Sequence, residues 1–464
     1  MAPFSSKQLA ALWPLPGPQL TVETPSRYPG STAETTKLVR KYLQKDFEQH
    51  HGFFNYWGAH NHTPFHLLVQ WSLGGTVDQI EAIWEQHVAQ ERGLGHSPQP
   101  ITTKNFSKHL GDQDYYQGYQ YFFADLLLKH SPNQVLEDWI FSPQANYGGD
   151  KPDMLNRLFA GILHPMLYLG YGLEFSLPGL MAEGLAQACV HGMSSSVLVP
   201  KSMFKTNGGD THAFTIVARI LADDKFRSFS GNFNDVMTQL GTELQEYAAE
   251  WGVDGSDPKD VSAKVKELCF MNTMFYVVGG WRDGEGFHKA DFTLLHLVTS
   301  AMTVCSYIAV IESPEHKSLF LRAYFIRSLA YFVAQGLPDL PLNSFFSADI
   351  LTEFPDAEPD PSETAYPDAS IPNLWFKVIQ SSLVHPDDHL SKTQRTLAHF
   401  GSLWSTVPAG EFEDTELDDS SMIDGTLFVR AAALTMEWMG RIREGEPARL
   451  WANDPNFPES DLND

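Results

Sequence analysis

Apolar residues recur at three- and four-residue spacing along most of this chain, and that pattern restricts its possible folds more than any other feature. Such spacing predicts amphipathic helices. Strand-like alternation is rare, and residues 19–24 (QLTVET) are the best candidate for it. We therefore predict a mainly α protein. The predicted helices are 36–50, 63–73, 77–92, 113–130, 133–141, 152–175, 211–224, 234–251, 262–275, 287–313, 316–335, 373–384, 392–402 and 424–446.

Two of these segments, 152–175 and 287–313, are apolar nearly all round, which is typical of central helices enclosed by others. Residues 338–372 are rich in Pro, Asp and Glu. We predict a long acidic loop or lid there, because helical periodicity resumes on both sides. No repeat of fixed period is present, so we expect one large domain over residues 1–464, with a helical body at 34–446.

Composition and charge limit the classes of function. Hydrophobic residues make up 43% of the 464 residues, enough for a large core. The net charge of −25, without a cluster of basic residues, argues against nucleic acid as a partner. No signal peptide or membrane-spanning run is recognised, so we expect a cytoplasmic protein that binds no membrane. Cys189, Cys269 and Cys305 match no zinc or redox spacing, and we expect them reduced and buried.

Glycine-rich nucleotide-binding motifs are missing. The sequence has no GxGxxG after a strand, no Walker loop and no GxSxG elbow. A Rossmann-type site for NAD or FAD is therefore disfavoured.

The segment GAHNHTPFHLL contains the densest group of histidines, His60, His62 and His66. A helix is expected to begin here, with Asn61 or His62 as its cap and Pro64 in its first turn. His62 and His66 would then share one face, at the spacing with which a helix offers two imidazoles to one metal ion. The alternative is that these histidines cap the helix or bond to nearby carbonyl groups.

His164 and His296 each lie in an almost wholly apolar helical segment. A buried histidine needs partners for its ring nitrogens, so each is either a satisfied core residue or a metal ligand. Two such helices beside an i, i+4 pair favour a metal site inside a helical assembly.

Lys377 is the only charged residue in NLWFKVIQSSLV (373–384). A buried lysine is costly unless it is paired or neutral. A neutral amine can react with carbon dioxide to give a carbamate, which is an oxygen ligand. The residues alone favour the alternative, in which the amine reaches the surface.

HPDDH (385–389) is a second possible metal motif, with His385 and His389 four residues apart and Asp387 between them. It follows an apolar helix in a polar connection and reads as the start of the next helix. We therefore do not expect it to bind metal.

The motifs GAHNHTPFHLL, HPMLYLGYGLEF and ADFTLLHLVTS together resemble the questin oxidase family of fungal polyketide tailoring enzymes, over residues 35–445. The resemblance is closest to the non-haem iron dioxygenases that open anthraquinone rings. It implies Fe(II) bound by histidines and by a carbamate on a lysine, with one position left open. The implied ligands are His62, His66, His164, His296 and Lys377, with His60 as a substitute for one of them.

The resemblance also implies a substrate and a reaction. An anthraquinone of the emodin or chrysophanol type, reduced to its hydroquinone, reacts with molecular oxygen, and its central ring is opened. Whether a separate reductase supplies the hydroquinone is left open. Tyr168 or Glu174 could handle a proton, and Thr299 could bond near the oxygen site. Candidate walls of a flat apolar pocket are Trp57, Phe65, Tyr168, Phe292 and Trp375.

Three alternatives remain open from the sequence. The chain could be an NADPH- or flavin-dependent Baeyer–Villiger-type oxidase. It could also be a non-enzymatic helical binding protein, in which every histidine is a core or cap residue. A hydrolase that uses the histidines on zinc is the third.

Overall fold

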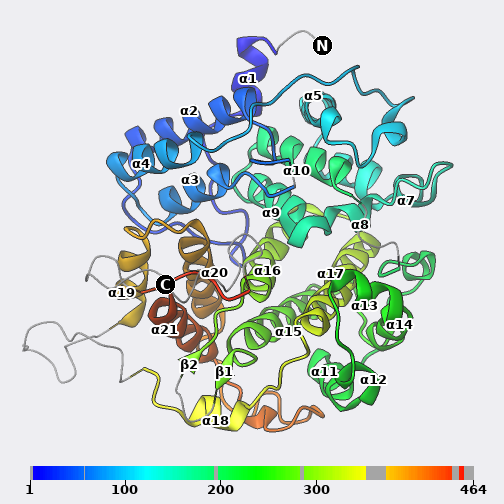
Figure 1. Ribbon diagram of the computed structural model, residues 1–464, viewed down its shortest axis with the longest axis vertical. Coiled ribbons are helices and arrows are strands. Elements are labelled where there is room, and N and C mark those ends of the chain that lie inside the picture. Colours follow the sequence, from blue (N-terminus) through cyan, green and yellow to red (C-terminus); the bar gives the residue numbers. More distant parts are fainter. Residues whose placement is uncertain are drawn as a thin grey trace, which may run out of the picture.

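The computed structural model describes residues 4–56, 58–192, 197–282, 287–351, 373–440 and 449–453. Helices dominate, as predicted, and pack into one multi-helix body (Figure 1). The helices are α1 (Ser6–Leu12), α2 (Ala33–Gln49), α3 (Thr63–Ser72), α4 (Val77–Val88), α5 (Tyr116–Leu127), α6 (Pro132–Leu136), α7 (Pro143–Tyr147), α8 (Met154–Leu158), α9 (Ala160–Glu174), α10 (Pro178–Val190), α11 (Ala213–Ala222), α12 (Asp224–Arg227), α13 (Phe233–Gln239), α14 (Gly241–Ala249), α15 (Pro258–Val277), α16 (Phe292–Val310), α17 (Pro314–Ala334), α18 (Leu342–Ser347), α19 (Leu374–Ser382), α20 (Asp388–Trp404) and α21 (Leu427–Met439).

Short turns and one hairpin complete the described elements. Strands β1 (Trp281–Arg282) and β2 (Phe287–His288) pair antiparallel. Single helical turns are η1 (Phe106–His109), η2 (Gln113–Tyr115), η3 (Glu137–Phe141), η4 (Lys201–Lys205) and η5 (Ser420–Met422).

Helix α16 lies at the centre of the body, packed against α9, α15, α17 and α20 (Figure 1). It is long and apolar enough to cross a membrane, but 78% of its apolar window is buried inside the protein, which marks it as a core helix. The helices before α8 lie on one side of this centre, around α10, and α11–α14 lie on the opposite side. The central helices predicted at 152–175 and 287–313 thus hold their expected place.

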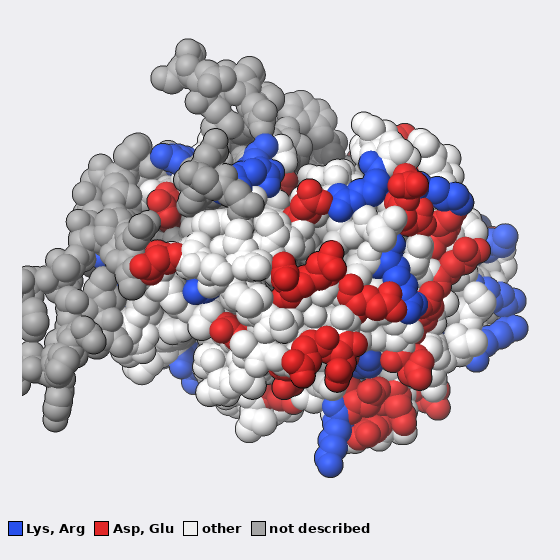
Figure 2. Space-filling view, turned by 90° about the horizontal axis from the view of Figure 1, so that it is seen from below, with Lys and Arg blue, Asp and Glu red and all other residues white. Residues whose placement is uncertain are grey.

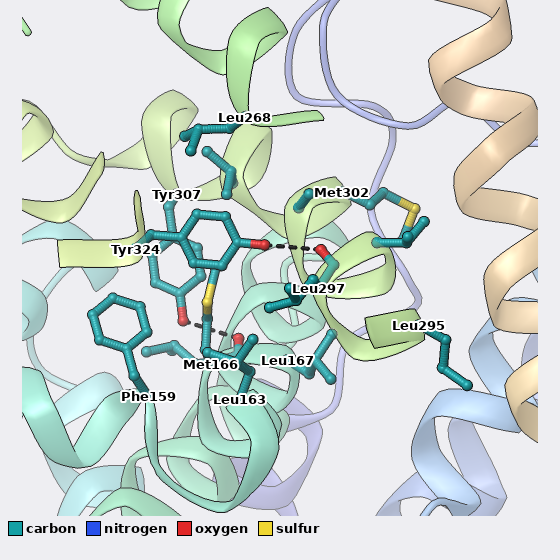
Figure 3. Packing of buried hydrophobic residues seen from close by; sticks show 14 of the residues in the cluster. Phe159, Leu163, Met166, Leu167, Leu268, Leu295, Leu297, Met302, Tyr307 and Tyr324 are labelled. Atoms are coloured by element: carbon teal, nitrogen blue, oxygen red, sulfur yellow. Dashed lines mark hydrogen bonds between the residues drawn. The ribbon is translucent and has the colours of Figure 1, made fainter. Parts of the chain in front are cut away.

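Two buried tyrosines connect the central helices across an otherwise apolar core (Figure 3). The Tyr307 hydroxyl of α16 donates to the Met166 carbonyl of α9 at 3.0 Å. The Tyr324 hydroxyl of α17 donates to the Leu297 carbonyl of α16 at 2.9 Å. Because a buried hydroxyl without a partner is costly, each bond favours one register between neighbouring helices. The first contact fixes α16 against α9, and the second fixes α17 against α16.

The predicted helix at 152–175 is interrupted. Helix α8 ends at Leu158, and Gly161, Ile162 and Leu163 adopt left-handed backbone conformations with φ of 52°, 51° and 66°. Two of these residues carry a branched side chain, for which such a conformation is strained. The apolar pattern runs through this break, so periodicity alone could not reveal it.

The predicted strand at 19–24 is wrong. Thr24 Oγ1 accepts the backbone N–H groups of Leu20 and Thr21, and the segment forms turns. The predicted acidic loop at 338–372 contains helix α18, and its residues 352–372 lie outside the described part of the chain.

Acidic side chains gather in patches on one face of the molecule, with Lys and Arg among them (Figure 2). This agrees with the net charge of −25. Cys189, Cys269 and Cys305 are buried free thiols, as predicted.

Candidate metal centre

Four histidines meet in the interior, three from within helices and one from the residue before α3, and we call them the histidine quartet: His62, His164, His296 and His389. They form a closed circuit of neighbours, with ring centroids 5.0 Å apart for His62 and His164, and 4.9 Å for His164 and His296. His296 and His389 are 5.2 Å apart, and His389 and His62 4.6 Å. His296 is fully buried and the other three are nearly so.

The start of α3 explains how His62 comes to point into this site. Asn61 Oδ1 accepts the Thr63 backbone N–H at 2.8 Å, so Asn61 performs the capping that the sequence also allowed for His62. The His62 ring makes no capping bond. It reaches instead to α20, where its Nδ1 lies 2.7 Å from Asp388 Oδ2.

The left-handed break before His164 sets the orientation of that ring. It turns the Gly161 carbonyl toward the ring, so that His164 Nδ1 lies 2.7 Å from the Gly161 oxygen. A Cβ atom at residue 161 would lie 2.4 Å from His191 Nε2 and 2.7 Å from His60 Cε1, so glycine is required there. Pro165 lies in the first turn of the regular helix that resumes after Leu163, where its missing N–H costs little.

Hydrogen bonds fix the tautomers of three quartet members. His62 Nδ1 meets a carboxylate, whereas His164 Nδ1 and His296 Nδ1 each meet a backbone carbonyl at 2.7 Å. These oxygens only accept, so each Nδ1 carries the hydrogen and each Nε2 exposes a lone pair. Metal-bound histidines are held in this way by their outer partners.

The Nε2 atoms of His62 and His164 lie 2.9 Å apart. With both tautomers fixed, two lone pairs face each other, which is repulsive unless a cation lies between them. A proton does not fill this role near neutral pH. Burial lowers the pKa of His62 to about 4, with Asp388 opposing and Lys392 adding to the shift. Burial, with His60, holds the pKa of His164 well below its usual range.

A metal ion fits this arrangement. Nitrogen ligands lie about 2.1 Å from a metal, so two ligands at right angles are separated by roughly 3 Å. His296 Nε2 is buried and has no hydrogen-bond partner among the described residues. His62, Asp388 and His389 can place ligand atoms within 4.8 Å of one another. Imidazole donors suit iron, copper and zinc.

Asp388 acts as an outer partner of two quartet members. One carboxylate oxygen lies 2.7 Å from His62 Nδ1 and the other 3.4 Å from His389 Nδ1. Burial raises the pKa of this carboxyl, but His389 and His62 outweigh it and hold the pKa well below the usual range. Asp388 therefore stays ionised and orients both rings.

Lys392 lies one turn beyond Asp388 on α20 and is fully buried. Its Nζ has no hydrogen-bond partner among the described residues and lies 5.1 Å from the centre of the Phe65 ring. Burial lowers its pKa, although Asp388 and Asp387 oppose the shift. The positive charge of Lys392 also contributes to the lowered pKa of His62. The pKa of His296 is lowered by burial and His389, and Lys392 adds to this shift. The charge of the amine therefore affects two members of the quartet.

Two of the predicted ligands lie elsewhere. The Nδ1 of His66 is 3.1 Å from His87 Nε2 of helix α4, so its ring faces that helix. Lys377 is partly exposed on α19, between the exposed Phe376 and the buried Val378. The buried lysine that the chain brings to the quartet is Lys392.

HPDDH was not expected to bind metal, but the structure places two of its residues, Asp388 and His389, in the candidate centre. His385 and Asp387 do not lie in that group; Asp387 caps α20. His60, the predicted substitute ligand, lies beside the quartet. Its ring stacks on His164 with centroids 3.9 Å apart, and its Nε2 is 2.6 Å from His191 Nε2.

Two of the predicted pocket walls lie beside the quartet, although their role as walls stays a prediction. The Phe65 ring is 5.9 Å from that of His62, and the Phe292 ring is 5.0 Å from that of His389. Trp57 lies outside the described residues, and Trp375 is partly buried against Gly401 of α20.

The candidate proton-handling residues have different surroundings. Tyr168 donates its hydroxyl hydrogen to the Asn61 carbonyl, next to His62. Thr299 lies one turn from His296 and donates to the His296 carbonyl at 3.4 Å. Glu174 forms a buried ion pair with Arg395, which occupies its carboxylate. Their catalytic roles stay predictions.

Comparison with known proteins gives a consistent result. The family model described as questin oxidase-like matches residues 59–397. A Baeyer-Villiger monooxygenase of Aspergillus aculeatus is 23% identical, covering 93% of this chain and 91% of its own. A Baeyer-Villiger oxidase of Pestalotiopsis microspora is 22% identical over 86% and 88%. The questin oxidase of Aspergillus terreus is 22% identical over 76% and 78%.

Proposed function

This chain belongs to the questin oxidase-like family, and from that premise we propose that it is an iron-dependent dioxygenase that opens the central ring of an anthraquinone hydroquinone. The oxidase names of its relatives support the coarser statement that it is an oxidoreductase. The pair of Nε2 atoms 2.9 Å apart, with both tautomers fixed, is the observation that carries the finer proposal.

The quartet would hold the iron. His62, His164 and His296 offer Nε2 lone pairs, and His389 completes four imidazoles. Iron bound there would supply the redox chemistry that allows molecular oxygen to react with an aromatic ring. The chain's own contribution is to orient the imidazoles through Asp388 and two backbone carbonyls and to exclude water with the surrounding core.

We propose Lys392 in place of Lys377 as the carbamate. The amine nitrogen attacks carbon dioxide, a C–N bond forms, and one proton leaves to solvent. The product is an anionic oxygen ligand. Its formation requires a neutral amine, and burial favours that state at Lys392. The new charge would offset part of the charge of a divalent ion.

The substrate would be flat and aromatic, lying near Phe65 and Phe292, which border the quartet. It is proposed to enter as the hydroquinone, with a separate reductase as one source. Both atoms of one oxygen molecule then enter the ring-opened product, so oxygen is the only oxidant and no external electrons are consumed in that step.

A second candidate function has support in the names of several relatives, which are called Baeyer-Villiger oxidases. Labelled oxygen distinguishes the two. Under ¹⁸O₂, the pre-reduced substrate should give a product with two labelled atoms and no consumption of NADPH. A single labelled atom per turnover, together with stoichiometric NADPH oxidation by the protein alone, would support the Baeyer–Villiger reaction instead.

A further inference from the structure

The short C-terminal segment formed by residues 449–453, here called the strap, crosses the beginnings of two helices that supply the quartet. Its backbone pairs with the start of α16, where Ala452 N–H donates to the Ala290 carbonyl and Phe292 N–H donates to the Ala452 carbonyl, at 2.9 and 2.8 Å. The segment is drawn in red beside α16 and α20 in Figure 1.

Each of these two helices begins with an aspartate cap. Asp291 accepts the Leu294 N–H at 2.9 Å at the start of α16, and Asp387 accepts the Leu390 N–H at 2.8 Å at the start of α20. Such caps satisfy backbone N–H groups that would otherwise lack partners. The caps therefore define where each helix starts.

The strap holds both caps. Asn453 Nδ2 donates to the second oxygen of Asp291, and Trp451 Nε1 donates to the Asp387 carboxylate, 3.1 and 3.2 Å from its two oxygens. Trp451 is 2% exposed. Because two side chains two residues apart bind the caps of two different helices, the strap fixes the distance between those helix starts.

The beginnings of these two helices carry two members of the quartet and the neighbouring Lys392. His296 lies five residues after Asp291, and Lys392 lies five residues after Asp387, with His389 between. The Trp451 ring is also 6.4 Å from that of His389. A shift of either helix start would therefore change the separation between His296 and His389.

We propose that Trp451 and Asn453 are positioning residues that clamp α16 and α20 in the arrangement that the metal centre requires. This inference rests on the proposed function, since it concerns the same site. Outer partners of this kind raise metal affinity by orienting the ligands rather than by touching the ion.

The test uses the full chain and a double variant, Trp451→Phe with Asn453→Gly. Phenylalanine keeps the packing but removes the indole donor. Glycine removes the amide donor and still adopts the left-handed backbone found at residue 453, where φ is 57°. The control is Trp251→Phe, which removes an indole donor from another buried carboxylate, Glu267, at 2.8 Å.

Co(II) alone serves as the probe, titrated into metal-free protein without oxygen. We expect the double variant to bind Co(II) roughly 10- to 100-fold more weakly than the unmodified chain, and the control within about twofold. Amide hydrogen exchange should also speed up in the first turns of α16 and α20 in the double variant only.

Unchanged Co(II) affinity together with unchanged exchange in those turns would overturn the clamp. If the unmodified chain binds no Co(II), the proposed metal centre fails. The exchange measurement then decides separately whether the strap holds the two helices.

Discussion

Two buried polar clusters in this protein differ in how their groups are satisfied. The Glu267 cluster lies between α11, α14 and α15. Its carboxylate accepts from Lys264 Nζ, Trp251 Nε1 and the Ala213 N–H at 2.8, 2.8 and 2.9 Å. Each of these three contacts pairs a donor with an acceptor. In the histidine quartet, by contrast, acceptors face each other.

The difference distinguishes a buried cluster that stabilises the fold from one that could bind a ligand. Burial of polar groups is tolerated when the protein itself supplies the partners, as it does around Glu267. The quartet has fixed tautomers, two opposed lone pairs and a neighbouring amine without a hydrogen-bond partner among the described residues. Such an arrangement is favoured when a cation lies between the lone pairs, as the proposed metal centre requires.

The largest expected effect is that of His296→Ala. Removing this ligand should lower turnover by roughly a thousandfold, which corresponds to about 4 kcal/mol of lost transition-state stabilisation. The free energy of unfolding of the metal-free chain should fall by less than when a histidine bonded at both ring nitrogens is removed. His296 Nε2 has no partner among the described residues to lose. Oxygen uptake with a hydroquinone substrate measures the first, and urea unfolding of metal-free protein the second. Turnover within tenfold of that of the unmodified chain would contradict a metal-binding role for the quartet.

Glu267→Ala should show the opposite pattern. The substitution leaves Lys264, a side chain that is 11% exposed, without its carboxylate. We expect the free energy of unfolding to fall by about 3–5 kcal/mol, with the metal content of the folded protein unchanged. As a control, the double change Lys264→Met with Glu267→Gln should recover most of the lost stability. Loss of metal from folded Glu267→Ala would contradict a purely structural role.

Lys392→Met and Lys377→Met form a matched pair that sharpens the comparison. Methionine preserves the length of the side chain without its amine. Lys392→Met should weaken metal binding or turnover by roughly 10- to 100-fold, because the buried amine adjoins the quartet. Lys377→Met should stay close to the unmodified chain, since its side chain is partly exposed on α19. The reverse order of effects would restore Lys377 as the ligand.

The last prediction concerns acid stability and a buried histidine outside the quartet, His51. Burial and Arg92 lower the pKa of His51 to about 4, although its bond to the Gln113 carbonyl opposes the shift. The folded chain thus keeps His51 neutral while the unfolded chain binds a proton below pH 6.5. Its contribution is complete above pH 6.5 and is lost as the pH falls toward 4, at up to about 1.4 kcal/mol per pH unit.

Unfolding measured from pH 7 to 4 tests this contribution. In His51→Asn the side-chain oxygen can still accept the Phe53 N–H, which His51 Nδ1 accepts at 3.0 Å. This variant should lose less stability on acidification than the unmodified chain. His96→Asn, at an exposed position, serves as the control and should leave the pH slope unchanged. An unchanged slope in His51→Asn would show that His51 does not carry the effect.

Periodicity predicted the helical class, the two central helices and three quartet members, because apolar helices that carry single histidines stand out in the sequence. It missed Asp388 and Lys392, and His389 was set aside together with HPDDH, for a physical reason. Helix α20 is polar in sequence, yet residues 389–401 are buried throughout. Hydrophobic pattern assigns such a helix to the surface, and only tertiary packing shows that its polar groups face the interior.

The left-handed break at Gly161 was equally invisible, since the side chains that require glycine there, His60 and His191, come from distant parts of the chain. Lys377 is a different case. Its place among the ligands came from the family resemblance, whereas the residues alone favoured an amine that reaches the surface, and α19 does leave one face exposed.

Elemental analysis of the purified chain, beside His296→Ala, tests the central claim most directly. If the quartet is a metal centre, the protein should contain about one iron atom per chain, and the folded variant should contain almost none. Less than about a tenth of an equivalent of any transition metal in active, folded protein would contradict the account. The opposed lone pairs of His62 and His164 would then need a different explanation.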